Sequence, residues 1–102
     1  MAQYILLSKL TDEGRRSLKN RPLRYQEVNE EVASMGARVL QQFAVMGDYD
    51  FVNIIEAPTN EVTARIAVEL GSRGTLQIKT LPAIRIEEFA EMLQGANHNE
   101  AE

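Results

Sequence analysis

Residues 38–56 read RVLQQFAVMGDYDFVNIIE, and this stretch decides the fold. Residues 38–46 and 49–56 are rich in Val, Ile, Phe and Tyr, which is typical of β-strands. Between them stands Gly47-Asp48, a two-residue connection with glycine first, as a type II′ hairpin turn requires. The sequence therefore predicts an antiparallel hairpin whose register is fixed by the turn and in which Gly47 has positive φ.

Two further strands are expected outside the hairpin. Residues 4–10, YILLSKL, form a short apolar run ahead of a threonine, which is typical of a buried strand. Residues 76–86 form the fourth strand. Pro82 places that strand at an edge of the sheet, because proline has no N–H to donate to a neighbouring strand.

A broken helix is predicted between the first strand and the hairpin. Thr11 precedes two acidic residues, so it is an N-cap followed by side chains that the helix dipole favours. Apolar residues then recur at spacings of three and four up to Met35, as on one face of an amphipathic helix. Pro22 lacks the N–H that the preceding turn needs, which predicts an interruption at residues 20–21. Gly36 ends the helix in a left-handed conformation.

A second helix follows the hairpin, and a shorter one comes near the end of the chain. The second helix is capped by Thr59 or Asn60 and ends at Gly71. Residues 87–93, EEFAEML, predict the short last helix. The residues that follow carry no apolar anchor, so we expect a flexible acidic tail over residues 95–102.

These elements follow the order β-α-β-β-α-β, which is the ferredoxin-like split βαβ arrangement of the α+β class. Right-handed crossovers place both main helices on one face of a four-stranded antiparallel sheet with strand order 4-1-3-2. A chain of 102 residues has the length of one domain. We therefore expect a single ferredoxin-like domain over residues 1–94, ahead of the tail.

The sheet face that the helices leave open is expected to be apolar. In residues 49–56, apolar side chains occur on both sides of the strand, and the first strand shows the same pattern. To the open face we assign Tyr49, Phe51 and Ile55, together with Tyr4, Gln42 and Asn53. A small monomer rarely leaves such a patch in water, so the sequence predicts a homodimer or higher oligomer whose copies cover this face.

Charge and composition exclude several classes of function. The chain has 11 basic and 15 acidic residues, and five of the acids lie in residues 87–102, so residues 1–86 are nearly neutral. This balance argues against a nucleic-acid partner. With no cysteine and with His98 as its one histidine, the chain offers neither a thiol nucleophile nor a histidine metal cluster, and we predict no cofactor. No apolar run is long enough for a bilayer and no signal pattern is present, so we expect no membrane partner and a cytoplasmic location.

Three segments carry a family resemblance, and they read YILLSKLT (residues 4–11), VMGDYDFV followed by IIEAP (residues 45–58), and ELGSRGTLQIKTLPA (residues 69–83). In these segments the chain resembles the GYD-domain family, over about residues 3–93. The family is named for a Gly-x-Tyr-Asp segment, which here is Gly47-Asp48-Tyr49-Asp50. The resemblance implies a dimeric α/β barrel of ferredoxin-like fold with no agreed biochemical function.

One end of the predicted sheet brings several polar residues together. In the predicted topology, Lys9 at the end of the first strand lies near Asp50 in the third. The start of the first helix and the segment 71–74 lie at the same end. Our candidate ligand-binding residues are therefore Lys9, Tyr49, Asp50 and Asn53. The structural alternative is that Lys9 and Asp50 form an ion pair that fixes the hairpin.

Other motifs near this end favour structural roles. Gly47 is assigned to the hairpin turn. Gly71 and Gly74 are assigned to capping of the second helix, because a helix C-terminus is the wrong end of the dipole for a phosphate. Asp48 and Asp50 offer fewer oxygen ligands than a hard cation needs, so no metal site is predicted.

Three functions remain open on this sequence. The first is a small homo-oligomeric module that binds a small molecule or a partner at its subunit interface. The second is a cofactor-free monooxygenase or isomerase, of the kind that dimeric α/β barrels host, although no catalytic residue is identified. The third is a purely structural oligomerisation protein.

Overall fold

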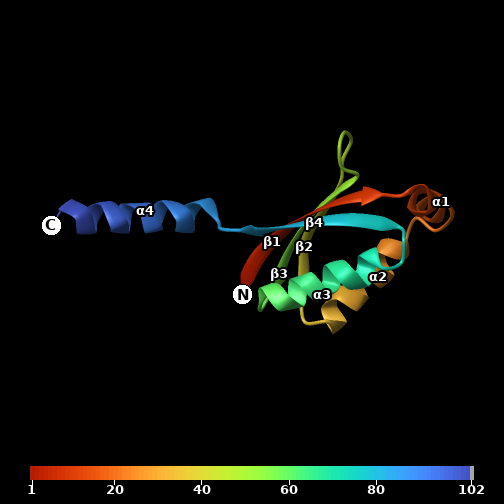
Figure 1. Cartoon of the computed structure of the whole chain (residues 1–102), viewed down its shortest axis with the longest axis horizontal. Helices are drawn as coiled ribbons and strands as arrows, with labels where there is room; N and C mark the ends of the chain where they lie inside the picture. Colours follow the sequence, from red (N-terminus) through yellow and green to blue (C-terminus); the bar gives the residue numbers. More distant parts are fainter. Residues whose placement is uncertain (102) are drawn as a thin grey trace.

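The structure is a computed structural model that describes the backbone of residues 1–101 and the side chains of residues 1–95. Figure 1 shows the strands and helices of the described part. In chain order they are β1 (Ala2–Leu10), α1 (Asp12–Asn20), α2 (Arg24–Ser34), β2 (Arg38–Ala44), β3 (Phe51–Ala57), α3 (Asn60–Gly71), β4 (Leu76–Ala83) and α4 (Ile86–Ala101).

A four-stranded antiparallel sheet in the order β2-β3-β1-β4 forms the centre of the fold. α2 and α3 lie on the same face of this sheet, and α1 lies beyond its end (Figure 1). The arrangement confirms the predicted α+β ferredoxin-like fold and the predicted strand order. β4 is an edge strand, as Pro82 predicts.

The first helical segment is divided where Pro22 predicts. α1 ends at Asn20 and α2 begins at Arg24. α2 then ends before Gly36, whose φ of +98° confirms the left-handed conformation. The division lets α1 turn across the end of the sheet while α2 runs beneath it (Figure 1).

Side-chain caps start α1 and α3. Thr11 Oγ1 accepts a hydrogen bond from the N–H of Gly14 at 3.1 Å, which confirms the first cap. Thr59, rather than Asn60, caps α3, and its Oγ1 accepts from the N–H of Val62 at 3.3 Å. Each cap satisfies one N–H that the first helical turn leaves without a partner.

The β2–β3 hairpin is wider than a two-residue turn. The strands end at Ala44 and Phe51, which pair in the predicted register, and the predicted extension to Met46 and Tyr49 is wrong. One predicted contact beyond the strand ends is present, because the carbonyl oxygen of Asp50 accepts from the N–H of Val45 at 2.8 Å. The N–H of Asp50 donates to the carbonyl oxygen of Ser8 in β1, at 2.9 Å. Gly47 has a φ of +120°, which confirms its positive φ.

The hydrophobic core lies between the sheet and the helices. Its buried apolar members are Tyr4, Leu6, Val32, Ala37, Ile55, Ala57, Ile66 and Leu70. Ile55 is 1% exposed and is in register with Tyr4, so these side chains of β1 and β3 face the helices. The prediction that Phe51 and Ile55 lie on the open face is therefore wrong. Both sides of β3 are apolar, so the alternation alone does not tell which side the helices cover.

Tyr4, Gln42 and Asn53 also belong to the helix-facing side, which corrects their assignment to the open face. The Tyr4 hydroxyl donates to Oδ1 of Asn60 at 2.5 Å. Gln42 accepts from the side-chain amide of Asn29 in α2 at 2.7 Å. Asn53 is in register with Gln42 and with Leu6 of the core.

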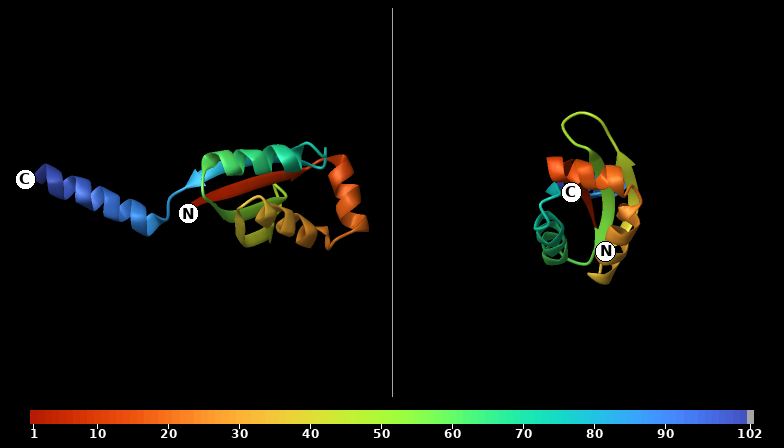
Figure 2. Two further views of the ribbon diagram at one scale, coloured as in Figure 1. Left: turned by 90° about the horizontal axis from the view of Figure 1, so that it is seen from below. Right: turned by 90° about the vertical axis from the view of Figure 1, so that its right-hand side faces the viewer.

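The last helix is longer than the sequence predicts. α4 begins at Ile86 and continues to Ala101, past the predicted end at residue 93. β4 ends at Ala83, three residues before the predicted end of its strand. Figure 2 shows α4 projecting from the sheet, which makes the molecule 61 × 30 × 19 Å. The flexibility predicted for residues 95–102 stays a prediction, and the side chains of residues 96–102 lie outside the described residues.

Candidate functional site

The uncovered face of the sheet is apolar at its centre. Its members share one side of the sheet by their register, and they are Ile5, Leu7, Phe43, Val52, Ile54 and Leu81. We call this surface the open face. Phe43 is 51% exposed and Leu81 is 38% exposed. An apolar surface of this kind is more often a site of interaction with another molecule than a surface that stays exposed to water.

A cleft of about 370 Å³ borders the open face next to the hairpin loop. Its lining combines basic, acidic and aromatic side chains from β1, β4 and the loop, among them Lys9, Lys79, Asp48 and Tyr49. Nζ of Lys79 lies 5.8 Å from the centre of the Tyr49 ring, which is the distance of a cation–π contact. The cleft therefore carries two ammonium groups beside one carboxylate and one phenol.

Asp50 is engaged in structural contacts. Its Oδ2 accepts a hydrogen bond from the N–H of Leu10 at 2.8 Å and lies 3.9 Å from a guanidinium nitrogen of Arg15. Among the residues that the structure describes, its ion-pair partner is therefore Arg15, and the predicted alternative of a pair with Lys9 is wrong. Arg15 reaches this carboxylate from the first turns of α1, one turn after the Thr11 cap.

The four candidate ligand-binding residues do not form one cluster. Lys9 and Tyr49 meet at the cleft. Asp50 follows Tyr49 in the sequence but directs its carboxylate to Leu10 and Arg15. Asn53 lies on the helix-facing side of the sheet. Lys79 joins the cleft without having been a candidate, because the register between β1 and β4, which places it opposite Leu7, cannot be read from the local sequence.

The three glycines assigned to turns differ in conformation. Gly47 and Gly74 have positive φ, of +120° and +77°. Gly71 is the last residue of α3, and its φ lies outside the left-handed region. Gly74 directly precedes Thr75, whose carbonyl oxygen accepts from the N–H of Thr11 at 3.0 Å. The α3–β4 connection and the start of α1 thus meet, as the predicted topology requires.

An ion pair between α2 and the α3–β4 connection is the main electrostatic feature of the helix side. The Arg73 guanidinium donates to both carboxylate oxygens of Glu31, 42 residues away in sequence. This hydrogen bonding holds the pKa of Glu31 below its ordinary value. It also raises the pKa of Arg73. Sequence spacing carries no signal for this pair, because only the tertiary fold brings the two residues together.

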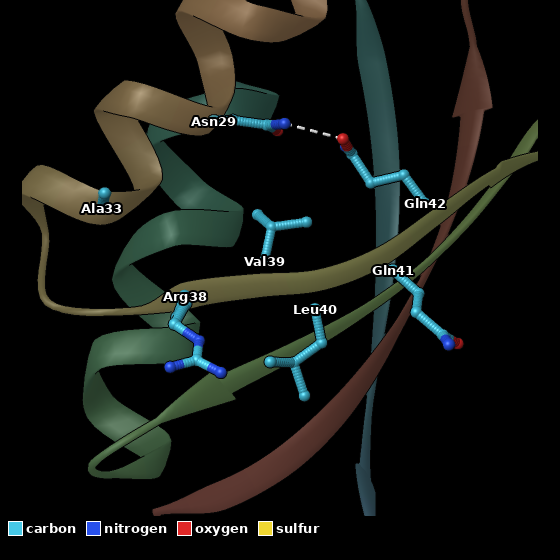
Figure 3. A pocket seen from close by; sticks show the side chains of 7 residues that line it. All are labelled: Asn29, Ala33, Arg38, Val39, Leu40, Gln41 and Gln42. Carbon is cyan, nitrogen blue, oxygen red and sulfur yellow. Dashed lines mark hydrogen bonds between the residues drawn. The ribbon is translucent and has the colours of Figure 1, made fainter.

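A second hollow, of about 360 Å³, lies between α2 and the edge strand β2. Figure 3 shows Asn29 and Gln42 joined across it by a hydrogen bond, with Arg38 and Gln41 lower along the strand. Val39 points between the helices in the same view. The register between β2 and β3 shifts between Val39 and Gln41, so Leu40 forms a β-bulge. The side-chain hydrogen bond from Asn29 to Gln42 spans this hollow and joins α2 to β2, so we assign the hollow a structural role.

The described residues were compared with the requirements of a metal site and of a membrane-spanning helix. Within that part of the chain, no group of three or more His, Cys, Asp or Glu side chains is arranged to hold a metal ion. None of the helices searched there is long and apolar enough to span a bilayer.

Comparisons with known proteins show which proteins this chain is similar to. A family model described as the GYD domain matches residues 4–93. The chain is 42% identical over 95 residues to the glutamine synthetase and cystathionine beta-lyase binding protein of Thermus thermophilus, a match that spans 92% of this chain and 100% of that protein.

Two solved structures share the fold. FFRP-DM1 has a TM-score of 0.54 at 21% sequence identity, with 82% of this chain and 100% of that chain covered. A protein of known structure from Thermus thermophilus has a TM-score of 0.52 at 23% identity, with 83% of this chain and 95% of that chain covered. At these identities the likeness concerns the fold alone.

Proposed function

Since the chain belongs to the GYD-domain family, whose model covers residues 4–93, we propose that it is a homo-oligomeric binding module whose partners are enzymes. Copies of the chain associate through the open face, and the assembly binds enzymes of amino-acid metabolism.

The proposed self-association rests on the apolar open face. Six apolar side chains, four of them on the central strands β1 and β3, lie on one side of the sheet with no helix over them in the described part of the chain. Burying apolar surface contributes about 25 cal/mol per Å². The identical patch on a second copy is the partner always present at matching concentration, and most small soluble oligomers are symmetric pairs.

The enzyme partners are proposed from the similarity to a named relative. The Thermus thermophilus protein that is 42% identical is called a glutamine synthetase and cystathionine beta-lyase binding protein, and this chain matches it over its whole length. Binding another protein requires a complementary surface and does not require a catalytic residue. This role is therefore compatible with a small domain in which no catalytic residue has been identified.

A small anionic molecule is a second candidate ligand. The cleft between β1, β4 and the hairpin loop places Lys9 and Lys79 beside the Tyr49 ring, and these groups suit a carboxylate or phosphate with an apolar part. The proposed ligand site therefore keeps two of the predicted residues, Lys9 and Tyr49, and includes Lys79 in addition. Native mass spectrometry of freshly purified protein tests it, and a retained small molecule lost in Lys9→Met is the expected result.

Sedimentation velocity at micromolar concentration tests self-association. The unaltered chain is expected to sediment as a dimer or larger species, and Ile54→Lys, on the open face, as a folded monomer. Val68→Lys is the matched control, because Val68 is 71% exposed on α3, on the other face of the sheet. A monomer for the unaltered chain contradicts the proposal.

Isothermal titration calorimetry tests the enzyme partners. Purified glutamine synthetase and cystathionine beta-lyase from the source organism are each titrated with the full chain, and an oligomeric enzyme outside amino-acid metabolism is the control. Saturable heat with the first two and none with the control is expected. Absence of binding to both removes the proposed enzyme partners and leaves self-association standing.

A further inference from the structure

The hairpin loop, residues 45–50, stands on the side of the sheet that the helices leave open. Figure 1 shows this loop on the opposite side of the sheet from α2 and α3, and the right-hand view in Figure 2 agrees. The contact of Tyr49 gives the same placement, because its ring lies 5.8 Å from Nζ of Lys79 on β4 although β1 separates β4 from β3. The loop therefore rises from the open face.

Hydrogen bonds fix the base of the hairpin loop. The carbonyl oxygen of Asp50 accepts from the N–H of Val45 at 2.8 Å, and the N–H of Asp50 donates to Ser8 in β1 at 2.9 Å. The carboxylate of Asp50 accepts from the N–H of Leu10 at 2.8 Å. A loop held in this way has little conformational freedom left to lose when it binds another molecule.

Met46 lies next to the tip of this loop and is 100% exposed. A single exposed apolar side chain is common on protein surfaces. Met46 differs from such a residue in its place, because the loop that carries it is anchored and rises over an apolar sheet face. Methionine is flexible and polarisable, so it packs well against irregular protein surfaces. Met46 therefore has the properties of a contact residue.

The length of the loop matches the spacing between two packed sheets. Residues 45–50 join β2 to β3, which places three residues on each side of the tip. Three extended residues span about 10 Å, and two sheets that pack face to face also lie about 10 Å apart. Because β2 is an edge strand, the loop stands at a corner of the sheet. A second copy that covers the open face therefore meets the tip of this loop at the border of its own sheet.

From these features we infer that the hairpin loop of each copy packs against a second copy, with Met46 buried at the border of the second sheet. We call this the loop contact. In a symmetric pair, each copy supplies one loop and receives one. The inference rests on the self-association proposed above, and it adds to the open face a second element through which the copies hold each other.

Methionine oxidation tests the loop contact. Dilute hydrogen peroxide converts exposed methionine to its sulfoxide, and mass spectrometry of peptides gives the rate at each position. Met92, which is 56% exposed on α4, is the internal reference. In the unaltered, associated protein, Met46 is expected to react at least roughly fivefold more slowly than Met92, because the second copy shields it. In the monomer expected for Ile54→Lys, Met46 is expected to react at least as fast as Met92.

Two results of this experiment contradict the loop contact, and they differ in what they leave standing. If Met46 reacts as fast in a sedimenting dimer as in Ile54→Lys, the loop contact is wrong and self-association through the open face remains. If the unaltered protein sediments as a monomer, self-association and the loop contact are both removed.

Substitution of Met46 provides a second, independent measurement. Met46→Ser is expected to raise the dissociation constant of the pair by at least roughly tenfold, because an apolar contact is lost at each of two loops. Met46→Leu keeps an apolar side chain and is expected to associate nearly as the unaltered chain does. Met92→Ser is the control on α4 and is expected to change nothing. Sedimentation velocity over a dilution series compares the variants, and equal association of Met46→Ser and the unaltered chain overturns the loop contact.

Discussion

The carboxylate of Asp50 holds the backbone N–H of Leu10, 40 residues earlier in the chain, at 2.8 Å. This bond ties the hairpin loop to the last residue of β1, directly before the cap of α1. The aspartate of the Gly-x-Tyr-Asp segment thus joins the hairpin loop to the end of β1, and this segment has a structural role whatever the protein binds.

The contacts of Asp50 predict different costs for two substitutions. Asp50→Ala removes the acceptor and leaves a partly buried N–H without a partner, so a loss of about 1–3 kcal/mol of stability is expected. Asp50→Asn keeps an oxygen for Leu10 and loses the charge facing Arg15, which on an exposed pair costs up to ~1 kcal/mol. Urea denaturation measures both. Asp48→Ala, on the exposed part of the loop, is the control, and equal losses at both positions argue against the anchoring role.

Gly47 is predicted to tolerate no side chain without strain. Its φ of +120° lies where L-residues are rarely found, so Gly47→Ala is expected to lower stability by at least about 1 kcal/mol. Gly71→Ala is the matched control. A Cβ there would lie 3.9 Å from its nearest neighbour, the Leu76 carbonyl oxygen, which is ordinary contact. Thermal melting of the two variants compares them, and a neutral Gly47→Ala contradicts a rigid loop.

Gly14 is predicted to be required for the position of α1. A Cβ at this site would lie 2.1 Å from the carbonyl oxygen of Thr75, which is backbone and cannot move alone. Gly14→Ala is therefore expected to lower stability by about 1–3 kcal/mol, as overpacking does, although alanine favours helices elsewhere. Urea denaturation measures the loss. Gly95→Ala in α4, with no atom within 4 Å of its Cβ, is expected to be neutral or stabilising.

The ion pair between Glu31 and Arg73 predicts a loss of stability in acid. Arg73 lowers the pKa of Glu31 in the folded state, so the folded protein binds this proton less readily than the unfolded chain. The contribution is fully present above the ordinary pKa of 4.5 and is lost as the pH falls through the lower, folded value. Urea midpoints of the unaltered protein and of Glu31→Gln are expected to differ near neutral pH and to converge in acid. A constant difference contradicts the assignment.

Local chemistry in the sequence was sufficient to predict most of the fold. Thr11 and Pro22 act on their immediate neighbours, so the start of α1 and the break before α2 follow from side-chain chemistry alone. The strand order follows from the element order and the handedness of the crossovers. The hairpin register also follows, because Gly47-Asp48 lies midway between the two apolar runs.

Features set by tertiary contacts could not be predicted in this way. Ile55 was assigned to the wrong face because alternation in an apolar strand defines two sides without saying which one the helices cover. Arg15, rather than Lys9, pairs with Asp50 because α1 turns across the end of the sheet. Lys79 entered the candidate cleft through the pairing of β4 with β1, which no local pattern encodes.

The two free edges of the sheet each carry an interruption. β2 has a β-bulge at Leu40, and β4 has Pro82, which offers no N–H to a further strand. An uninterrupted edge is a template on which strands of other molecules add without limit, and this growth leads to fibrous aggregates. Both edges of this sheet are therefore poor templates for the addition of further strands, although the face between them is apolar.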